Sequence, residues 1–344
     1  MVLPTTWLST FLCLILALIC LGSWINTFKA TGNRWRFELF SIDFAVGALL
    51  FSLIAAYTLG TLGADLGFSD RMLVAGRTNQ AMGLAAGAIF ALGNMLLLAA
   101  VSLLGISAAF PLCIGSAVVV AALFQFRSAQ GLWLAGGLAL LVCAVVVDIL
   151  AIRRNKKPIR PAGAKGSAKK APTSTRGIIV GIISGVVLGC FFVLIHRGFR
   201  GDFGLGPYAG LLLVSIALLV STLVLNLYFM NMAISGAPIG FSAYFTGLPH
   251  QHFFGFAGGA VWALGMLAQG LAMSAPAPVD LNSVVLTVVP LASVLLAVFW
   301  GFAKWKEYPG GAKTLVVASA VVFLCGVVLV GLAVTAKAIA LPGS

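Results

Sequence analysis

The polar side chains that could do chemistry in this chain lie inside long apolar segments. Such groups are costly at membrane depth, so they usually face a cavity or a partner helix. Amides and hydroxyls beside aromatic rings suit a neutral ligand that forms hydrogen bonds, such as a sugar, a ureide or a nucleobase. The candidate substrate-binding residues are Trp24, Asn26, Asn94, Trp262, Gln269, Asn282 and Thr287.

Each of these residues has a second interpretation, and the sequence leaves it open. An amide inside an apolar segment bonds one helix to another as readily as it contacts a substrate. The two tryptophans also suit anchors at the membrane interface.

A proton-coupled carrier needs a titratable group, and the acidic and imidazole side chains stand near the ends of apolar segments. Asp43 is the first coupling candidate, because it closely follows Arg34 and Arg36 and could exchange an arginine partner for a proton. His252 is the alternative, since a histidine changes charge near neutral pH. The competing interpretations are a static interfacial salt bridge for Asp43 and a histidine at headgroup level for His252.

No segment carries the clustered histidines and carboxylates that metal or acid–base chemistry requires. The six cysteines fall inside apolar runs without a Cys-x-x-Cys pair, which predicts buried thiols rather than disulfides or a zinc site. The stretch 163–170 lacks the spacing of a phosphate loop. We therefore expect no catalytic residue, no metal and no cofactor, and the chain is not predicted to be an enzyme.

The composition indicates a membrane protein. Hydrophobic residues make up 61% of the 344 residues and charged residues only 8%, whereas a soluble domain carries about 25% charged residues. The sequence therefore predicts a multi-pass integral protein of the plasma (inner) membrane. The net charge of +13 lies mostly between apolar segments. This distribution argues against nucleic acid and leaves the lipid bilayer, a small-molecule substrate and protons as expected partners.

One short stretch occurs twice. Residues 87–93 read Gly-Ala-Ile-Phe-Ala-Leu-Gly, and residues 259–265 read Gly-Ala-Val-Trp-Ala-Leu-Gly. The copies are half the length of the chain apart, which indicates an internal duplication, the usual build of a secondary transporter with its substrate site between the repeats. Trp262 matches Phe90, one helical turn from Asn94. We expect Trp262 to stack on the ligand and Asn94 to hydrogen-bond it, with Trp24, Asn26 and Asn282 as further walls.

The elements that must position these residues are ten transmembrane helices, five in each half. An odd number in each repeat means that the two copies insert with opposite orientations. The predicted fold class is an all-α polytopic membrane protein built from two inverted five-helix repeats, residues 1–152 and 177–344. The expected helices span residues 4–28, 42–62, 81–103, 107–126, 131–152, 177–197, 208–232, 254–274, 280–302 and 313–336.

Residues 153–176 form a basic linker between the repeats. The linker carries arginines and lysines and no acidic residue, and Gly, Pro, Ala, Ser and Thr fill most of the rest. With the loops near residues 29–40 and 303–313, it holds most of the loop cations. The positive-inside rule places these segments in the cytoplasm and both termini outside.

Several motifs carry a resemblance to a known group of proteins. They are Gly22-Ser-Trp-Ile-Asn-Thr27, Arg34-Trp-Arg-Phe-Glu-Leu-Phe40 with Asp43-Phe44, Gly93-Asn94, Ala109-Phe-Pro-Leu-Cys-Ile-Gly115, His252-Phe-Phe-Gly255, Gly258-Gly-Ala-Val-Trp262 and Trp305-Lys-Glu-Tyr308. With these residues the chain resembles the ten-helix drug/metabolite transporter superfamily. It looks most like the branch of ureide permeases and glucose/ribose- or rhamnose-type sugar porters.

This resemblance covers nearly the whole chain, and it implies proton-coupled or facilitated uptake of a small polar metabolite by a permease or symporter. The linker lacks the phosphate-loop motif associated with plant ureide permeases. The resemblance therefore implies a class of substrate rather than one compound. The expected function is secondary transport of a neutral polar metabolite of the ureide, nucleobase or sugar class by alternating access. The alternatives are a membrane-embedded enzyme acting on lipid and a structural or receptor-like membrane protein.

Overall fold

The computed structural model describes residues 1–32, 35–125, 131–155, 172–199, 203–234, 236–275, 281–308 and 310–340. Across these ranges every regular element is a helix. The helices are α1 (Trp7–Ser23), α2 (Ile25–Ala30), α3 (Phe37–Tyr57), α4 (Phe68–Val74), α5 (Arg77–Leu104), α6 (Ile106–Gln125), α7 (Gly131–Arg154), α8 (Pro172–Gly198), α9 (Pro207–Asn231), α10 (Ser242–Phe245), α11 (Pro249–Met273), α12 (Leu281–Ala303) and α13 (Gly311–Ala340).

Within the described part of the chain, nine helical segments are long and apolar enough to cross a membrane. They correspond to nine of the ten expected segments, with α1 and α2 together forming the first. The remaining expected segment, 280–302, coincides with α12, whose described apolar part, Val288–Ala303, is shorter. The predicted all-helical, multi-pass membrane protein is therefore confirmed at this level.

Several predicted boundaries were shifted, among them the start of the second helix. This helix begins at Phe37 rather than near residue 42, because the charged residues at its start are paired. Arg36, just before the helix, binds Glu38 in its first turn, and both are buried. Pairing removes much of the cost of burying each charge. The first expected helix is broken at Trp24, where α1 ends and α2 begins.

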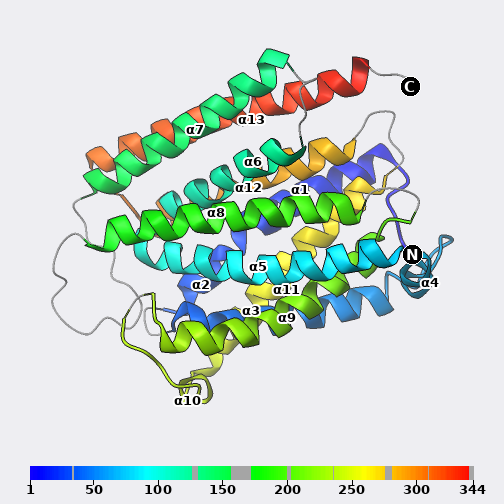
Figure 1. The fold of residues 1–344 in the computed structure, drawn as a ribbon, viewed down its shortest axis with the longest axis horizontal. Helices are drawn as coiled ribbons and strands as arrows, with labels where there is room; N and C mark the ends of the chain where they lie inside the picture. The colour runs from blue at the N-terminus through cyan, green and yellow to red at the C-terminus, as the bar shows by residue number, and fades with distance from the viewer. Residues whose placement is uncertain are drawn as a thin grey trace.

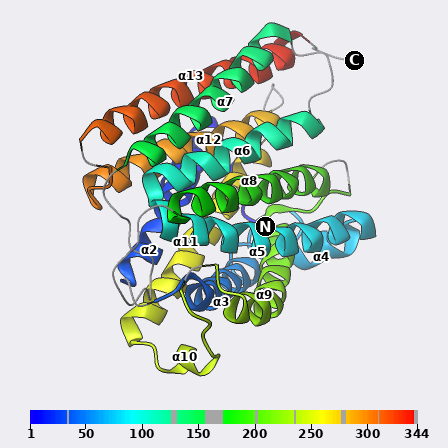
Figure 2. The same cartoon turned by 60° about the vertical axis from the view of Figure 1, so that its left-hand side comes forward.

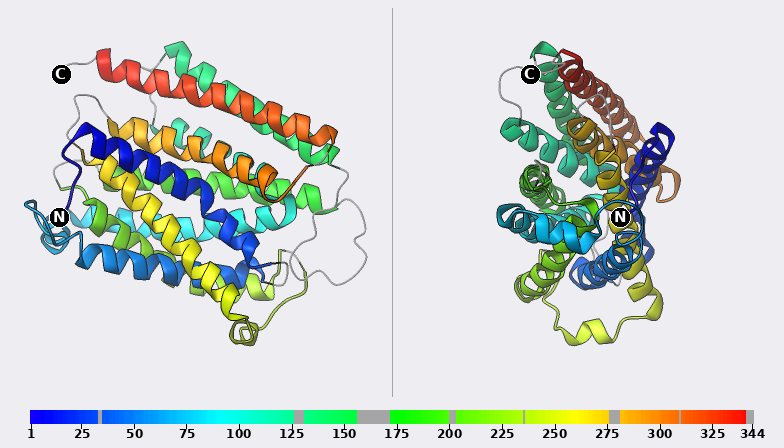
Figure 3. Two further views of the ribbon diagram at one scale, coloured as in Figure 1. Left: turned by 180° about the vertical axis from the view of Figure 1, so that it is seen from behind. Right: turned by 90° about the vertical axis from the view of Figure 1, so that its right-hand side faces the viewer.

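The long helices lie side by side along one direction (Figure 1). At one edge α7 packs along α13, and at the other edge α3 packs along α9 and α11 (Figures 1 and 2). Between them, α8 packs on α5 and α6, and α1 packs on α11 and α12. The view from behind shows α1 and α11 crossing the face opposite α8 (Figure 3). The N-terminus and the end of α13 lie at the same end of the bundle.

Several helices run in opposite directions along the bundle. In Figure 1, α7 runs from right to left and α13 from left to right. The same holds for α1 and α8. The short helix α10 lies beyond the bundle at the end where α9 finishes and α11 starts (Figures 1 and 2).

The duplicated stretches lie in α5 and α11, where they make equivalent close contacts. A Cβ atom added at Gly93 would come within 2.7 Å of the Leu188 side chain in α8. A Cβ added at Gly265 would come within 2.9 Å of the Leu21 side chain in α1. The first glycine of each copy approaches a backbone carbonyl, in α9 and α3 respectively. Small residues thus let α5 and α11 pack tightly against their partners, as is typical of membrane helices.

Candidate functional site

A cavity lies near the middle of the bundle, between α1, α5, α6, α8, α11 and α12. We call it the central cavity. Its polar lining residues are Gln269 and Ser293, and its aromatic residues are Trp24, Phe90, Phe110, Phe191, Phe192 and Trp262. None of the lining residues carries a formal charge. This lining suits a neutral solute that offers one flat face and a few hydrogen-bonding groups.

The aromatic side chains of the central cavity are packed against each other. Phe90 and Trp262, the matching positions of the duplicated stretch, stack with ring centroids 4.3 Å apart and planes 18° from parallel. Phe90 also contacts Phe191 at 5.0 Å, and Trp24 contacts Phe110 at 6.3 Å. Separations of this size are favourable for aromatic pairs. In this conformation one face of Trp262 is therefore covered by Phe90.

The open space in the central cavity is small. About 50 Å³ is available to the centre of a water-sized sphere, and one water needs about 10–15 Å³ by this measure. The cavity therefore has room for a few waters. In this conformation it is too small to hold a sugar or a nucleobase.

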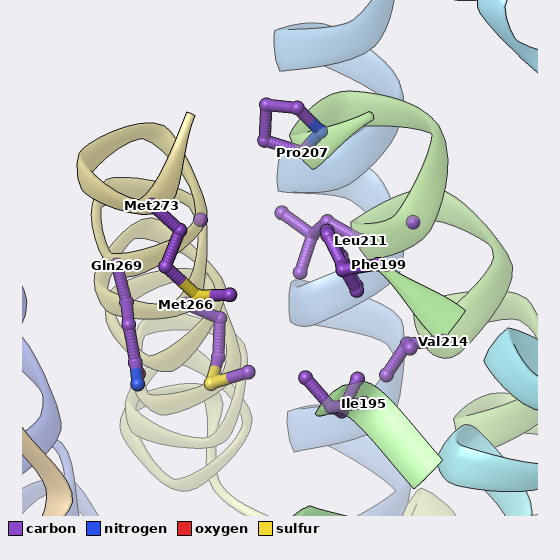
Figure 4. Close-up of a pocket in the computed structure, with 10 residues that line it drawn as sticks. Ile195, Phe199, Pro207, Leu211, Val214, Met266, Gln269 and Met273 are labelled. Carbon is purple, nitrogen blue, oxygen red and sulfur yellow. The ribbon is translucent and has the colours of Figure 1, made fainter. Parts of the chain in front are cut away.

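Two further cavities continue from the central cavity toward the end of the bundle that holds the N-terminus. The first, which we call the middle cavity, lies between α11 and the helices α8 and α9 (Figure 4). It shares Met266 and Gln269 with the central cavity. In Figure 4, Met266, Gln269 and Met273 project from α11 on one side, opposite the side chains of α8 and α9.

The next cavity, the outer cavity, is larger and more polar. It offers about 220 Å³ to the centre of a water-sized sphere, and Arg71 and Met1 are among its lining residues. It shares Phe199, Pro207 and Met273 with the middle cavity. The three cavities thus follow one another from the centre of the bundle to this end, and the middle cavity, at about 20 Å³, is the smallest of the three.

At the opposite end, α3, α10 and α11 are joined through one buried carboxylate. Asp43 of α3 is fully buried and accepts a hydrogen bond from the Tyr244 hydroxyl at 2.5 Å. The His252 Nδ1 atom lies 3.0 and 3.1 Å from its two oxygens. The imidazole ring contacts Trp35 and Tyr244 edge-on, each at 4.8 Å. We call these four residues the inner cluster.

Tyr244 keeps its proton in the inner cluster. Burial raises the pKa of Tyr244 well above its usual range, and the hydrogen bond to Asp43 and the charge of that carboxylate raise it further. The hydroxyl therefore remains a donor, and it fastens the segment between α9 and α11 onto α3.

Asp43 and His252, which the sequence offered as alternative coupling groups, lie in direct contact. The expected Arg36 partner of Asp43 is wrong, because the Arg36 guanidinium binds Glu38 and the Ala237 carbonyl instead. Arg34 lies outside the described residues.

A second set of contacts ties the loop after α12 to the first half. The Glu307 carboxylate pairs with Lys29 and accepts hydrogen bonds from the backbone N–H groups of Ile106 and Ser107, at 3.1 and 2.8 Å. A carboxylate suits this position, because the first N–H groups of α6 have no partner within the helix.

The structure places the predicted binding residues differently. Trp24, Trp262 and Gln269 line the central cavity. Asn26 links α2 to the end of α1 and to the loop after α12, since its Nδ2 donates to the Ser23 carbonyl at 2.9 Å and its Oδ1 accepts from Trp305 Nε1 at 2.7 Å. Asn94 is buried with its side-chain oxygen unpartnered, outside the cavity lining. The side chains of Asn282 and Thr287, in α12, lie outside the described residues.

Some site residues were not predicted. Phe90 could have been found, because it is the match of Trp262 in the first copy of the duplicated stretch. Phe191 could have been found from a second match, in which Leu21-Gly-Ser-Trp24 parallels Leu188-Gly-Cys-Phe191. Tyr244 stands in a segment without helical periodicity, and nothing in the sequence signals its contact with Asp43. Within the described ranges, no three His, Cys, Asp or Glu side chains lie close enough to hold a metal ion.

Comparisons with known proteins add information about the fold alone. No protein-family model matches the chain, and no curated protein matches it. The chain is similar to a solved structure described only as "Crystal structure of protein", with a TM-score of 0.51 and 15% sequence identity. The match covers 98% of this chain and 100% of that one. This likeness extends over the whole arrangement of helices, and at 15% identity it concerns the fold.

Proposed function

We propose that the protein is a secondary transporter that moves a small neutral polar metabolite of the ureide, nucleobase or sugar class across the membrane by alternating access. The observation that carries the proposal is the central cavity, an uncharged aromatic site with an amide and a hydroxyl that lies between the two halves of the chain. Transporters with internal repeats hold their substrate in such a place, near the middle of the membrane.

The pattern of helix packing supports two inverted five-helix repeats. Exchanging the halves pairs α1 with α8, α3 with α9, α5 with α11, α6 with α12 and α7 with α13. Under this exchange the contact of α5 with α8 becomes that of α11 with α1, and α6 with α8 becomes α12 with α1. The contact of α3 with α11 likewise becomes that of α9 with α5. The opposite directions of matched helices in Figure 1 favour an inverted rather than a parallel duplication.

The cavity lining follows the same exchange. Leu21 and Trp24 of the first half correspond to Leu188 and Phe191 of the second, and all four line the central cavity. Phe90 and Trp262 correspond to each other and stack. A cavity lined by matching residues is where motion of one repeat against the other would open a path alternately to each side.

The two ends of the bundle differ, as expected for one conformation of an alternating-access transporter. The inner cluster joins α3, α10 and α11 at the linker end. At the other end, the small apolar middle cavity is followed by the larger and more polar outer cavity. We therefore interpret the conformation as closed to the linker end and nearly closed to the other. By the charge of the linker and its neighbouring loops, the linker end is the cytoplasmic one.

On this proposal the chain is a member of the drug/metabolite transporter superfamily, located in the plasma (inner) membrane. Asp43 and His252 are proposed as one proton-coupling pair, because two titratable groups in direct contact take up and release protons as a coupled unit.

The proposal is tested by uptake into proteoliposomes that contain the purified full chain, with and without a pH gradient. A thermal-shift screen of sugars, nucleobases and ureides selects the solutes. A transporter gives saturable flux, which a pH gradient increases if protons are coupled. A membrane enzyme would give a product without a gradient, and a structural or receptor-like protein would give neither.

A further inference from the structure

Asp148, near the end of α7, is a buried carboxylate that the proposed substrate site does not use. It is fully buried, and neither carboxylate oxygen has a hydrogen-bond partner. It lies six residues before Arg154, or roughly 9 Å inside the end of the helix at 1.5 Å per residue. None of the ion pairs among the described residues involves Asp148.

The groups that face Asp148 cannot stabilise a negative charge. Cys113 of α6, and Tyr308 in the loop before α13, lie close enough for its charge to act on them. The Tyr308 hydroxyl already donates to the Leu104 carbonyl at 2.5 Å. The nearby hydroxyl of Ser319 in α13 donates to the Ala144 carbonyl at 2.9 Å.

The other charged groups near this region either have a partner already or are exposed. The Glu307 carboxylate pairs with Lys29. Four described cations near the end of α7 and the starts of α8 and α13 are exposed: Arg153, Arg154, Arg176 and Lys313. An ionised carboxylate without donor or cation is very costly in such a place, whereas the protonated acid is neutral and can donate to a backbone carbonyl.

Asp148 also stands directly behind a wall of the central cavity. Phe110 and Ile114 of α6 line the cavity, while Cys113, between them in sequence, is close enough to Asp148 for the carboxylate charge to act on the thiol. Pro111 interrupts the hydrogen bonding of α6 at this level, and proline weakens a helix at such a point. The helix between the cavity and Asp148 is therefore one that can shift.

We propose that Asp148 is a proton-binding site, occupied by a proton in this conformation and emptied when α6 moves away from α7 and admits water. Binding transfers one proton from water to a carboxylate oxygen, and release returns it. The link between this site and transport rests on the function proposed above, whereas the presence of the proton does not.

Infrared spectroscopy of the purified full chain at neutral pH tests for the proton. A protonated carboxyl gives a C=O stretching band separate from that of a carboxylate. Asp43, Glu38 and Glu307 each have a donor or cation, so Asp148 is expected to be the main source of this band. Asp148→Asn should abolish it, and Asp70→Asn, at an exposed carboxylate of α4, should leave it unchanged.

Absence of the band from the wild-type protein, or its persistence in D148N, would overturn the proposal. If D148N fails to accumulate, Asp148→Leu replaces it as a neutral variant of similar size. Failure of the transport proposal would be seen separately, as absence of saturable uptake with the infrared result unchanged.

The reactivity of Cys113 tests the movement of α6. In a chain where the other five cysteines are replaced, reaction of Cys113 with N-ethylmaleimide is followed as pH rises, with and without D148N. If deprotonation moves α6, the wild-type rate should rise relative to the D148N rate. A relative rate that stays constant or falls would contradict the movement, because a new charge beside a static thiol suppresses the reactive thiolate.

Discussion

Replacing Tyr244 by Phe removes one hydroxyl from the inner cluster and leaves the ring contacts with Trp35 and His252 in place. The lost interaction is a 2.5 Å hydrogen bond to the fully buried Asp43 carboxylate. Hydrogen bonds to charged groups contribute about 1.5–3 kcal/mol. Because Tyr244 is only partly buried, we expect a value near the middle of this range, about 2 kcal/mol.

The free energy of unfolding measured by denaturant titration in mixed micelles gives the comparison. Tyr228→Phe, at an exposed tyrosine of α9, is the matched control and should change stability by less than about 0.5 kcal/mol. A double-mutant cycle of Tyr244→Phe with Asp43→Ala isolates the coupling between the two side chains. A coupling energy below about 0.5 kcal/mol would refute our view that Tyr244 fastens α10 to α3.

Because the pKa of Tyr244 is raised, its contribution to the free energy of unfolding decreases at high pH. Because the folded-state pKa lies above the unfolded value of about 10, the stabilisation is complete below about pH 10 and is lost as pH rises through the folded value. Wild type should therefore lose more stability than Tyr244→Phe above pH 10. Equal losses in both proteins would contradict this assignment.

Three further predictions concern packing, topology and the outer route. Gly259→Ala should destabilise the fold by about 1–3 kcal/mol, because its new Cβ would collide with the Phe44 carbonyl. Gly136→Ala is the control and should be tolerated, since the nearest atom to its new Cβ lies 3.7 Å away. Equal melting temperatures of the two variants would contradict the close approach at Gly259. A single cysteine placed in the 153–176 linker, in a chain lacking the native six, should resist an impermeant thiol reagent in intact cells; rapid labelling would reverse the orientation. Met273→Trp should slow uptake by filling the small middle cavity without lowering expression, and unchanged flux would exclude this route.

Much of the fold could be predicted, because long apolar runs indicate membrane helices. In the structure these runs are helical, with ends that differ from the predicted ones. The start of α3 was missed because Arg36 and Glu38 looked like loop residues, and only their mutual pairing makes them compatible with burial. The break at Trp24 has no sequence signal of its own, since the apolar run continues through it.

Part of the lining of the central cavity was predictable from the similar stretches 87–93 and 259–265. Trp262 was found as a repeat residue, and Phe90 follows from the same match. Asn26 and Asn94 were chosen for their polarity, but polarity does not reveal the direction in which a helical side chain points. Asn26 points to Trp305, and Asn94 lies outside the cavity lining. The contact of Asp43 with Tyr244 joins residues about two hundred positions apart, and local patterns carry no information about such pairs.

The most direct test of the central claim is uptake by proteoliposomes containing wild type, Trp262→Ala or Trp7→Ala, with the melting temperature of each protein measured in parallel. Trp262 is 3% exposed and lines the central cavity, whereas Trp7 is 78% exposed on α1 and serves as the matched control. If the central cavity binds the transported solute, Trp262→Ala should weaken the apparent affinity, and Trp7→Ala should leave it unchanged. Unchanged apparent affinity in Trp262→Ala, together with a lowered melting temperature, would mean that Trp262 only fills space between helices and would contradict the account.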